Sequence, residues 1–577
     1  MSSGVGVAGA ADVNLATGGN PPGGWIGNPE IFESTFGGIG EGAPQGTVVA
    51  DSGFRPYPHG FPLPNWGSAD DFAVNSLIWG VPDRVTLQEI QKGEYASPAP
   101  LNSLALRRTL GNGVCRDPKA IDPKTGECDL ILGADLLAQS IETGALGGHC
   151  FGMAAAAAAL YNGQIPANQV GASGLGINAA NQMGKPAIET ITRLFGTQYL
   201  NSEILDLMNV GTSPTEVVQT LIRELPSGQV PYVLGLIGDG GGHAITPYAV
   251  TDRGDGLFDI AVYDNNFPLR ALAVTVDTTT DSFVYTSATD PNSPNYTWSS
   301  ENDAVVGLVP MDMILGKQPC PVCRGKDNGT LLSFSSWESV NSDEIGISLV
   351  DDKGDPLSPD LYRVFGPLNP DTEELSSAPL IAVEPGVDFG VLVQTGKLKT
   401  PQPLEVYAMS NGNSEYLLME SLPSDGVIVF GVGDGAALFE SNKVTSPRIQ
   451  QLWDGTRRSI DVNGHPLVLP AGATAFQNWD RPSKRITYDS SAKRTVTWNV
   501  QVSGVSDDGD VNWVGLGVKV PASAKIVVDY SKATSAIAPT AWVEAKGGAR
   551  TAITMEKVTQ SLIDRERDQI YVVQGPS

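Results

Sequence analysis

The chain has 577 residues and a formal net charge of −27, from 64 acidic and 37 basic side chains. A chain of this length exceeds one hydrophobic core and indicates three or more domains. The acidic balance, without a basic stripe, argues against nucleic acid or an anionic membrane surface as a partner. No run of eighteen apolar residues occurs, so we expect no transmembrane segment.

The N-terminal region is rich in Gly, Pro, Ala and Asn. This composition predicts an extended or partly disordered leader over residues 1–50. The first basic residue is Arg55, so the start of the chain lacks the positively charged segment of a signal peptide. We therefore expect no recognisable signal peptide.

One cysteine stands at the start of a strongly helical segment. Cys150 follows Gly147 and Gly148, which suit a loop, and precedes the alanine run 154–159. A thiol at a helix N-terminus lies at the positive end of the macrodipole and near unpaired N–H groups, and both favour the thiolate. Taken alone, such a cysteine is more often a buried small hydrophobe. With a suitable base nearby, Cys150 is predicted to be a nucleophile.

The next segment predicts helices and then strands. Apolar residues at helical spacing mark a helix over 186–199. Ser213-Pro214-Thr215-Glu216 is a capping box that opens a helix to about Leu225. Strands are predicted over 230–237, 244–250 and 258–263.

Only four histidines could serve as the base. His149 adjoins Cys150 in sequence, so its side chain should point elsewhere, while His59 lies in a proline-rich loop and His465 in a predicted surface turn. His243 remains, and it opens a strand after a glycine-rich loop. We therefore predict that His243 is the base.

A carboxylate should orient the imidazole of His243. The predicted strand 258–263 ends in Asp264-Asn265-Asn266. If this strand runs antiparallel to the one that His243 opens, Asp264 faces His243 and stabilises its charged form. The strand register leaves Asn265 or Asn266 as alternative orienting residues.

The order of a helix-borne Cys, a Gly-preceded His on a strand and an Asp or Asn after the next strand resembles the papain-like cysteine peptidase superfamily. The string Gly148-His149-Cys150-Phe151-Gly152-Met153 and the ending Tyr263-Asp264-Asn265-Asn266 resemble a bacterial branch of it. The resemblance covers about residues 50–315. It implies a two-part α+β domain, with a helical side carrying Cys150 and a β side carrying His243, that acts on a peptide or protein substrate.

One position departs from this resemblance. Papain-like enzymes carry a Gln six residues before the nucleophile, which helps to form the oxyanion hole, and here that position is Gly144. The Cys150 backbone N–H would therefore need another donor. Asn65 is our candidate, because it is a polar residue that precedes the nucleophile in chain order.

The remaining four cysteines suggest two pairs. Cys115 and Cys128 flank a polar loop that a disulfide could close, and Cys320 and Cys323 form a CxxC that is either a small disulfide or two free thiols. A single CxxC lacks the four ligands that zinc needs, so we expect no metal site and no cofactor. Two pairs and one free thiol favour an extracellular or cell-surface location.

The character of the chain changes after residue 330. Short apolar runs recur between turn residues, which is typical of antiparallel β-sandwiches; they span 346–350, 387–393, 404–408, 426–431, 495–502 and 524–530. We predict a papain-like domain over 51–318, a linker over 319–329, and β-domains over 330–440 and 441–577, the second with a short helix over 553–569. These β-domains are expected to bind a protein or a glycan.

Three functions remain open. In the first, Cys150, His243 and Asp264 cleave a peptide or amide bond through a thioester. In the second, the papain-like part is an inert scaffold in a surface binding or adhesion protein. In the third, the same chemistry passes the acyl group to an amine, as in transglutaminase-like enzymes.

Overall fold

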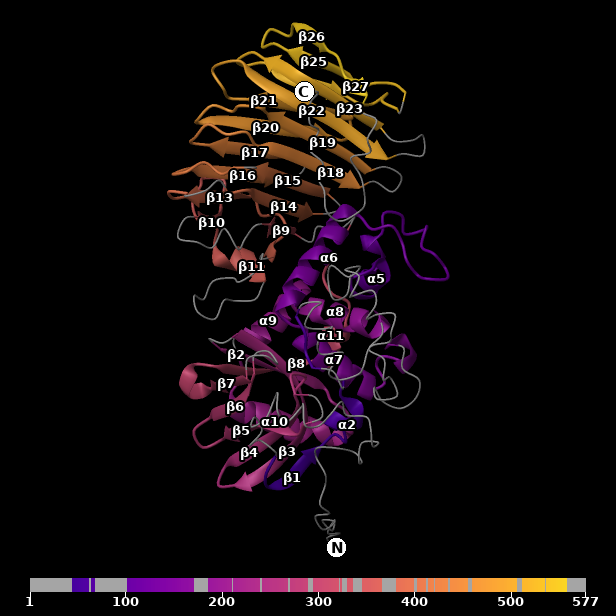
Figure 1. The fold of residues 1–577 in the computed structure, drawn as a ribbon, viewed down its shortest axis with the longest axis vertical. Helices are drawn as coiled ribbons and strands as arrows, with labels where there is room; N and C mark the ends of the chain where they lie inside the picture. Colours follow the sequence, from indigo (N-terminus) through magenta and orange to yellow (C-terminus); the bar gives the residue numbers. More distant parts are fainter. Residues whose placement is uncertain are drawn as a thin grey trace. The chain divides into compact units, whose positions relative to one another are not determined.

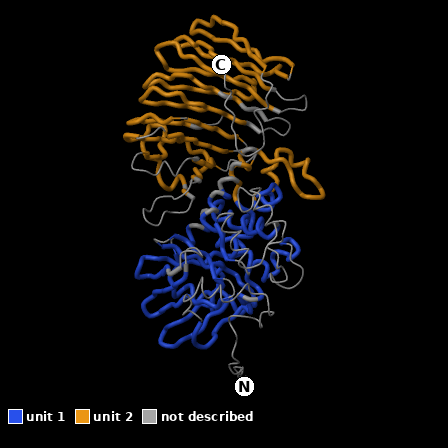
Figure 2. Tube along the Cα trace, in the orientation of Figure 1, with its two compact units in different colours: residues 1–109, 141–318, 367–374 blue, residues 110–140, 319–366, 375–577 orange. Residues whose placement is uncertain are grey.

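The structure is a computed structural model in which the described residues form two compact units. Unit 1 comprises residues 1–109, 141–318 and 367–374, and unit 2 comprises residues 110–140, 319–366 and 375–577 (Figure 2). The described ranges are 44–61, 64–67, 101–170, 185–209, 211–238, 241–267, 270–288, 294–320, 322–323, 329–335, 345–365, 380–398, 402–410, 413–419, 421–433, 436–454, 459–505, 511–534 and 536–557. Most of the predicted leader lies outside them.

The sheet of unit 1 is antiparallel, and its strands follow the order β7-β6-β5-β4-β3-β2-β8 (Figure 1). Its long strand β3 pairs with β2 through its first half and with β1 through its second half. The bounds are β1 Thr47–Asp51, β2 Tyr232–Gly238, β3 Gly241–Gly254, β4 Leu257–Tyr263, β5 Leu272–Asp277, β6 Ser282–Ala288, β7 Pro294–Ser299 and β8 Val305–Pro310. Because β1 belongs to this sheet, the predicted leader boundary at residue 50 is wrong: the folded unit already includes residue 47.

One of the helices assigned wholly or partly to unit 1, α7, is buried along most of its length. Every residue of the alanine run in α7 is fully buried, as expected for a helix that is apolar on all sides. The bounds are α2 Pro56–His59, α5 Ser103–Leu110, α6 Leu132–Gly144, α7 Cys150–Tyr161, α8 Lys185–Leu200, α9 Ser202–Asn209, α10 Pro214–Glu224 and α11 Met311–Leu315. The predicted helices over 186–199 and 213–225 are confirmed as α8 and α10.

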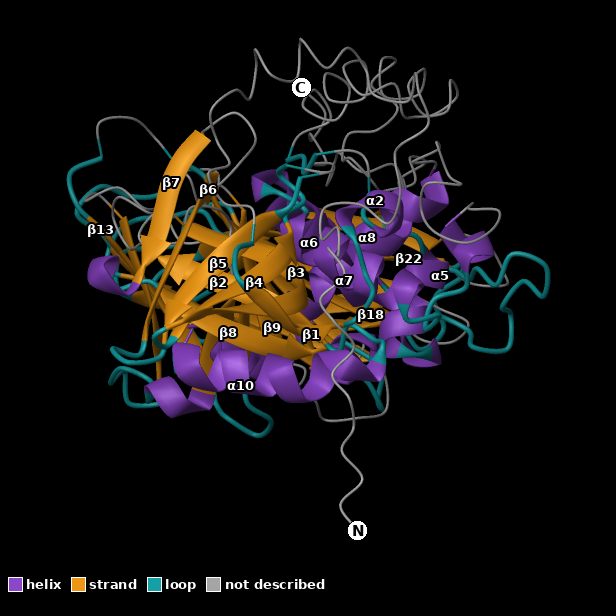
Figure 3. Cartoon of the chain, turned by 90° about the horizontal axis from the view of Figure 1, so that it is seen from below, coloured by secondary structure: helices purple, strands orange, loops and turns teal. Residues whose placement is uncertain are grey.

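Helices α7, α9 and α10 pack on the sheet of unit 1, α9 against β8 and β2. Helix α7 contacts β2 and β3, and α10 contacts β1, β3, β5 and β8 (Figure 3). Ser213 caps α10 as predicted, since its side chain accepts a hydrogen bond from the Glu216 N–H and Pro214 occupies the first turn. The small side chains of α7 allow close approach on its other side: a Cβ on Gly152 would lie 2.1 Å from the Ile191 carbonyl oxygen of α8.

Unit 2 contains two antiparallel sheets whose apolar faces share one core. The strand orders are β10-β13-β16-β17-β20-β21-β24-β25-β26 and β11-β12-β9-β14-β15-β18-β19-β22-β23-β27 (Figure 1). The bounds are β9 Thr330–Ser335, β10 Ile345–Val350, β11 Tyr362–Phe365, β12 Leu380–Val383, β13 Phe389–Thr395, β14 Leu404–Ser410, β15 Asn413–Met419, β16 Val427–Gly433, β17 Ala436–Ser441, β18 Arg448–Asp454, β19 Ser459–Pro466, β20 Ala473–Asp480, β21 Arg485–Ser490, β22 Val496–Val505, β23 Val511–Val520, β24 Lys525–Asp529, β25 Thr540–Glu544, β26 Arg550–Ile553 and β27 Glu556–Lys557.

From β14 onward, successive hairpins alternate between the two sheets. The hairpins β14–β15, β18–β19 and β22–β23 lie in one sheet, and β16–β17, β20–β21 and β24–β25 lie in the other. Strand β17 pairs with β20 across the predicted domain boundary at residue 440. The described strands on both sides of that boundary therefore form one continuous sandwich, in contrast to the two separate β-domains predicted from the sequence.

The first residues of the helix expected over 553–569 are not helical, and the rest of that range lies outside the described residues. Residues 550–553 form strand β26 and 556–557 form β27, while residues from 558 onward lie outside the described ranges.

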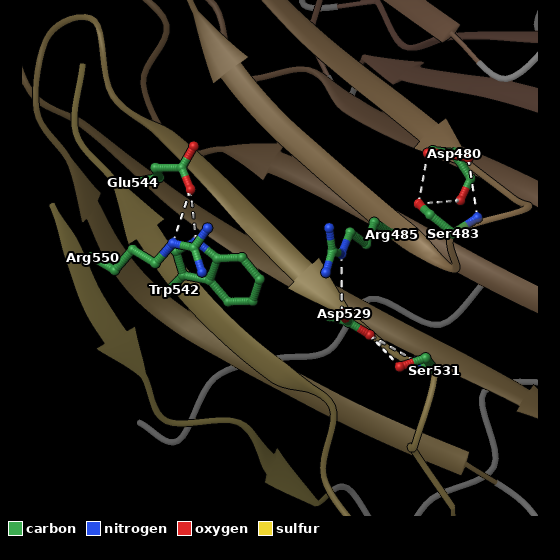
Figure 4. A network of polar contacts seen from close by, with 8 residues as sticks. All are labelled: Asp480, Ser483, Arg485, Asp529, Ser531, Trp542, Glu544 and Arg550. Carbon is green, nitrogen blue, oxygen red and sulfur yellow. Dashed lines mark hydrogen bonds and ion pairs between the residues drawn. The ribbon is translucent and has the colours of Figure 1, made fainter. Parts of the chain in front are cut away.

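Charged cross-strand pairs cover the end of the nine-stranded sheet that β26 forms (Figure 4). Arg485 lies opposite Asp529 at 3.0 Å, and Arg550 lies opposite Glu544 at 3.1 Å. Arg550 lies on the short edge strand β26, where a charged side chain opposes pairing with another chain.

Both disulfides of the chain lie in unit 2. Cys115 is bonded to Cys128, as expected from the sequence, and Cys320 is bonded to Cys323, which is one of the two alternatives left open for the CxxC. The two are neighbours, since a Cβ on Gly113 would lie 2.8 Å from the Cys323 sulfur. The only free cysteine is Cys150.

Candidate active site

Three elements of unit 1 bring the predicted site residues together. Cys150 is the first residue of α7, His243 lies near the start of β3, and Asp264 directly follows β4. Strands β3 and β4 pair antiparallel, with Thr246 opposite Tyr263. The start of β3 therefore lies beside the end of β4, which is the arrangement expected from the sequence.

His243 and Asp264 form a buried pair. The His243 Nε2 atom lies 2.8 Å from Asp264 Oδ1, and neither side chain is exposed to solvent. In this contact the Nε2–H points toward the carboxylate. Nδ1 is the ring nitrogen that does not contact Asp264. Nδ1 is buried and has no hydrogen-bond partner within the described residues.

Asp264 is held by further donors. Its Oδ1 also accepts a hydrogen bond from the Asn266 N–H at 2.8 Å, and its Oδ2 accepts from the Tyr285 hydroxyl at 2.6 Å and from the Ser287 hydroxyl. Burial alone would raise the pKa of Asp264, but the charge of His243 and these hydrogen bonds lower it below its usual value. The carboxylate is therefore fixed in place and ionised.

The environment of His243 favours its charged form. Burial alone would lower its pKa, but the Asp264 charge and hydrogen bond outweigh burial, and Cys150 adds to the effect, so that the pKa rises to about 10. This contribution from Cys150 places the thiol within electrostatic reach of the imidazole. Cys150 is itself partly exposed, so a reagent can reach it.

Asn265 does not take the orienting role. Its side-chain amide donates hydrogen bonds to the Cys150 carbonyl at 3.0 Å and to the Ala244 carbonyl at 2.8 Å. It thereby ties the first turn of α7 to the start of β3. The alternative orienting residue Asn265 therefore joins the nucleophile helix to the base strand, and Asp264 is hydrogen-bonded to the His243 ring.

The residues just before Cys150 are fixed by the segment around Asn65. The Asn65 Oδ1 accepts a hydrogen bond from the His149 N–H at 2.7 Å, and the Asn65 amide nitrogen lies 3.0 Å from where a Cβ on Gly148 would stand. Gly148 has a φ of 134°, a conformation that favours glycine. The weak oxyanion candidate Asn65 thus lies beside the loop that presents Cys150.

His149 is buried and turned away from the pair, as its position next to the nucleophile suggested. Its Nδ1 donates to the Trp66 carbonyl at 2.8 Å, and its ring stacks on the Trp66 ring with centroids 4.5 Å apart. Burial lowers the pKa of His149 to about 4. This imidazole is therefore neutral and structural.

The two remaining histidines lie in other surroundings. His59 ends α2 and accepts a hydrogen bond from the Arg55 N–H, and burial lowers its pKa to about 4. His465 lies in strand β19, where its Nε2 is 2.8 Å from the Ser446 hydroxyl, so its assignment to a surface turn is wrong. The Asn-Gly-His-Pro string resembles a turn, but the ladder with β22 continues through it.

Several residues around the pair were not found from the sequence. Tyr285 and Ser287 come from β6, two strands from β4, and their alternation on one face of that strand was the only available signal. Trp298 of β7 stacks on the His243 ring with centroids 5.8 Å apart, and Tyr296 packs edge-on against Trp298. These rings shield the charged pair from water.

The described residues contain no group of three or more His, Cys, Asp or Glu side chains arranged to hold a metal ion. Within the described part of the chain, no helix has both the length and the apolar composition for crossing a bilayer. No protein-family model, curated protein or solved structure matches this chain.

Proposed function

We propose that this chain is a cysteine hydrolase that cleaves a peptide or amide bond with Cys150 as nucleophile, His243 as base and Asp264 as orienting residue. The observation that carries the proposal is the buried His243–Asp264 pair, whose imidazole interacts electrostatically with a partly exposed cysteine at a helix N-terminus. These are the three parts of an activated nucleophile: an attacking atom, a base and a group that orients the base.

The proposed reaction has two steps. The Cys150 thiolate attacks the carbonyl carbon, the carbonyl π electrons move onto oxygen, and the C–N bond breaks as the His243 imidazolium gives its proton to the leaving amine. Water then attacks the thioester while His243 takes one of its protons, and the C–S bond breaks to release the acid and restore the thiolate. Asp264 keeps His243 in one orientation and stabilises its charge in both steps.

The arrangement of unit 1 also supports this proposal. The nucleophile lies on a buried helix and the base on an antiparallel sheet, as in the two-part papain-like fold that the sequence resembles. We further propose that the substrate is a peptide or protein, and that the sandwich of unit 2 binds a protein or a glycan.

Thiol labelling tests the proposed pair. An ordinary cysteine has a pKa of about 8.5 and is only about 0.1% thiolate at pH 5.5. We expect iodoacetamide to label the wild-type protein at Cys150 at this pH up to about 10³-fold faster than it labels a small free thiol, because the imidazolium stabilises the thiolate.

Two variants and one control define the outcome. Cys150→Ala should abolish the labelling, and His243→Ala should reduce its rate to that of an ordinary thiol. His465→Ala removes an imidazole from the sandwich of unit 2, where it contacts the Ser446 hydroxyl, and should leave the rate unchanged. Slow labelling of the wild type that does not depend on His243 would overturn the proposal and favour an inert scaffold. Product analysis with an added primary amine separates hydrolysis from acyl transfer, since a hydrolase releases mainly the free acid and an acyl transferase mainly the amide of the added amine.

A further inference from the structure

A nucleophilic attack on a carbonyl group needs more than a nucleophile and a base. The carbonyl oxygen becomes negatively charged, and donors that already point at it lower the barrier. The Cys150 backbone N–H, at the first position of α7, is one such donor because no intrahelical acceptor serves it. The proposed reaction requires a second donor on the same side of the cysteine.

The Tyr199 hydroxyl occupies the space next to the loop before Cys150. A Cβ on Gly144 would lie 2.7 Å from the Tyr199 hydroxyl oxygen and 2.9 Å from the ring carbon that carries it. No side chain larger than hydrogen fits at position 144 while Tyr199 stays in place. The hydroxyl of the tyrosine on α8 therefore fills the space that a side chain at position 144 would occupy.

The packing of α7 on α8 explains why Tyr199 reaches this end of the helix. Gly152 contacts Ile191 and Phe195, and one residue before Cys150 the His149 ring lies 5.7 Å from the Phe195 ring. Tyr199 follows Phe195 by one turn, with ring centroids 5.4 Å apart. The two helices thus run in opposite directions, and α8 carries Tyr199 past the N-terminus of α7.

The Tyr199 hydroxyl is suited to donate a hydrogen bond. Its side chain is only 8% exposed. Burial raises the pKa of Tyr199 well above its usual value, and the charge of Cys150 raises it further. The phenol therefore stays protonated at every pH at which the thiolate–imidazolium pair exists.

We propose that the Tyr199 hydroxyl, together with the Cys150 backbone N–H, donates a hydrogen bond to the oxyanion formed when Cys150 attacks a carbonyl carbon. This inference rests on the proposed hydrolase function and names the missing donor of that site. Tyr199 touches the reacting oxygen and is in this sense a catalytic residue. Asn65, the donor expected from the sequence, accepts the His149 N–H with its side-chain oxygen.

Two reagents separate oxyanion stabilisation from thiol reactivity. Acylation of Cys150 by p-nitrophenyl acetate passes through a tetrahedral oxyanion, whereas alkylation by iodoacetamide displaces iodide and forms none. Both rates are measured by mass spectrometry of the full chain, with Cys150→Ala as the blank. For Tyr199→Phe we expect the acylation rate to fall on the order of 10²-fold while the alkylation rate stays the same.

A matched variant controls for the loss of a buried hydroxyl. Tyr161→Phe removes a hydroxyl from the other end of α7, where it bonds to the Ser52 carbonyl at 2.6 Å, and should leave both rates unchanged. Equal rates in Tyr199→Phe and the wild type would overturn the role of Tyr199. A parallel fall of both rates in Tyr199→Phe would also overturn this role, and so would a loss of acylation alone in Asn65→Ala. If the wild type itself shows no activated thiol, the hydrolase proposal fails first, and the two failures are thereby distinguished.

Discussion

The close contact of α7 with α8 predicts that Gly152→Ala destabilises unit 1. The added Cβ would lie 2.1 Å from the Ile191 carbonyl oxygen, 2.9 Å from the Ile191 carbonyl carbon and 3.0 Å from the Phe195 Cβ. Two of these three atoms belong to the backbone of α8, so no rotation of a flexible side chain can relieve the overlap. The two helices must move apart instead.

The size of the effect follows from the geometry. Ordinary van der Waals contact begins at 3.4 Å, so the carbonyl oxygen is roughly 1.3 Å too close. Overpacking of a well-packed core costs about 1–3 kcal/mol. We expect the upper part of this range, because the displaced neighbour is a helix rather than a side-chain tip. The movement also shifts Tyr199 relative to Cys150, so the acylation rate should fall more than the alkylation rate.

Hydrogen exchange followed by mass spectrometry measures this destabilisation locally. Exchange in peptides from α7 and α8 should accelerate in Gly152→Ala, and the free energy of unfolding from urea titration should fall. Gly147→Ala is the matched control, because a Cβ there meets no atom within 4 Å and Gly147 lies in the same stretch of chain. It should change the free energy of unfolding by less than about 0.5 kcal/mol.

Equal stability of Gly152→Ala and the wild type would refute this reasoning. It would mean that α7 and α8 lie further apart than described. The argument that α8 carries Tyr199 past the start of α7 depends on the same packing and would then fall with it.

Three other predictions concern pH and disulfides. Asp264→Asn removes the charge that raises the His243 pKa to about 10, so the imidazolium stabilises the Cys150 thiolate less and iodoacetamide labelling at pH 5.5 should slow; an unchanged rate would exclude this coupling. His149 is buried with a pKa of about 4 against 6.5 when unfolded, so its contribution to stability is fully present above pH 6.5 and falls by about 3 kcal/mol as the pH falls to 4. Urea unfolding should show this slope, and His149→Phe should reduce it to the part that His59, with a similarly lowered pKa, contributes. Replacing Cys115 and Cys128 by Ala should lower the free energy of unfolding by about 3 kcal/mol, since their bond closes a loop with a sequence separation of 13; an unchanged urea midpoint would contradict this.

Local patterns in the sequence were sufficient to predict many of the helices and strands. The capping box at Ser213 and the helical spacing within 186–199 correspond to α10 and α8 with bounds close to those observed. The contact between His243 and Asp264 was also predictable, because two short-range strand assignments and an antiparallel pairing imply it. In each case the deciding interactions lie within a few residues or between adjacent strands.

Other features depend on contacts that the sequence does not encode locally. An apolar run such as 426–431 indicates a strand, but not which of two sheets the strand joins, so the sequence was interpreted as two domains where the structure has a single sandwich. Tyr199 was missed because its relation to Gly144 exists only once α8 packs against α7. Tyr285 likewise reaches Asp264 across two intervening strand pairings.

The alternating hairpins of unit 2 mean that this sandwich is built from a repeated step of constant length. Each pair of hairpins adds two strands to both sheets, and neighbouring strands lie about 4.8 Å apart, so one pair extends the sandwich by about 10 Å. Strands β18 to β21, residues 448–490, make up one such step. Gain or loss of a step leaves every remaining strand with an antiparallel neighbour and the two faces still opposed. A fold of this kind can therefore become longer or shorter by one whole step at a time, through duplication or deletion of about forty residues, without a new core.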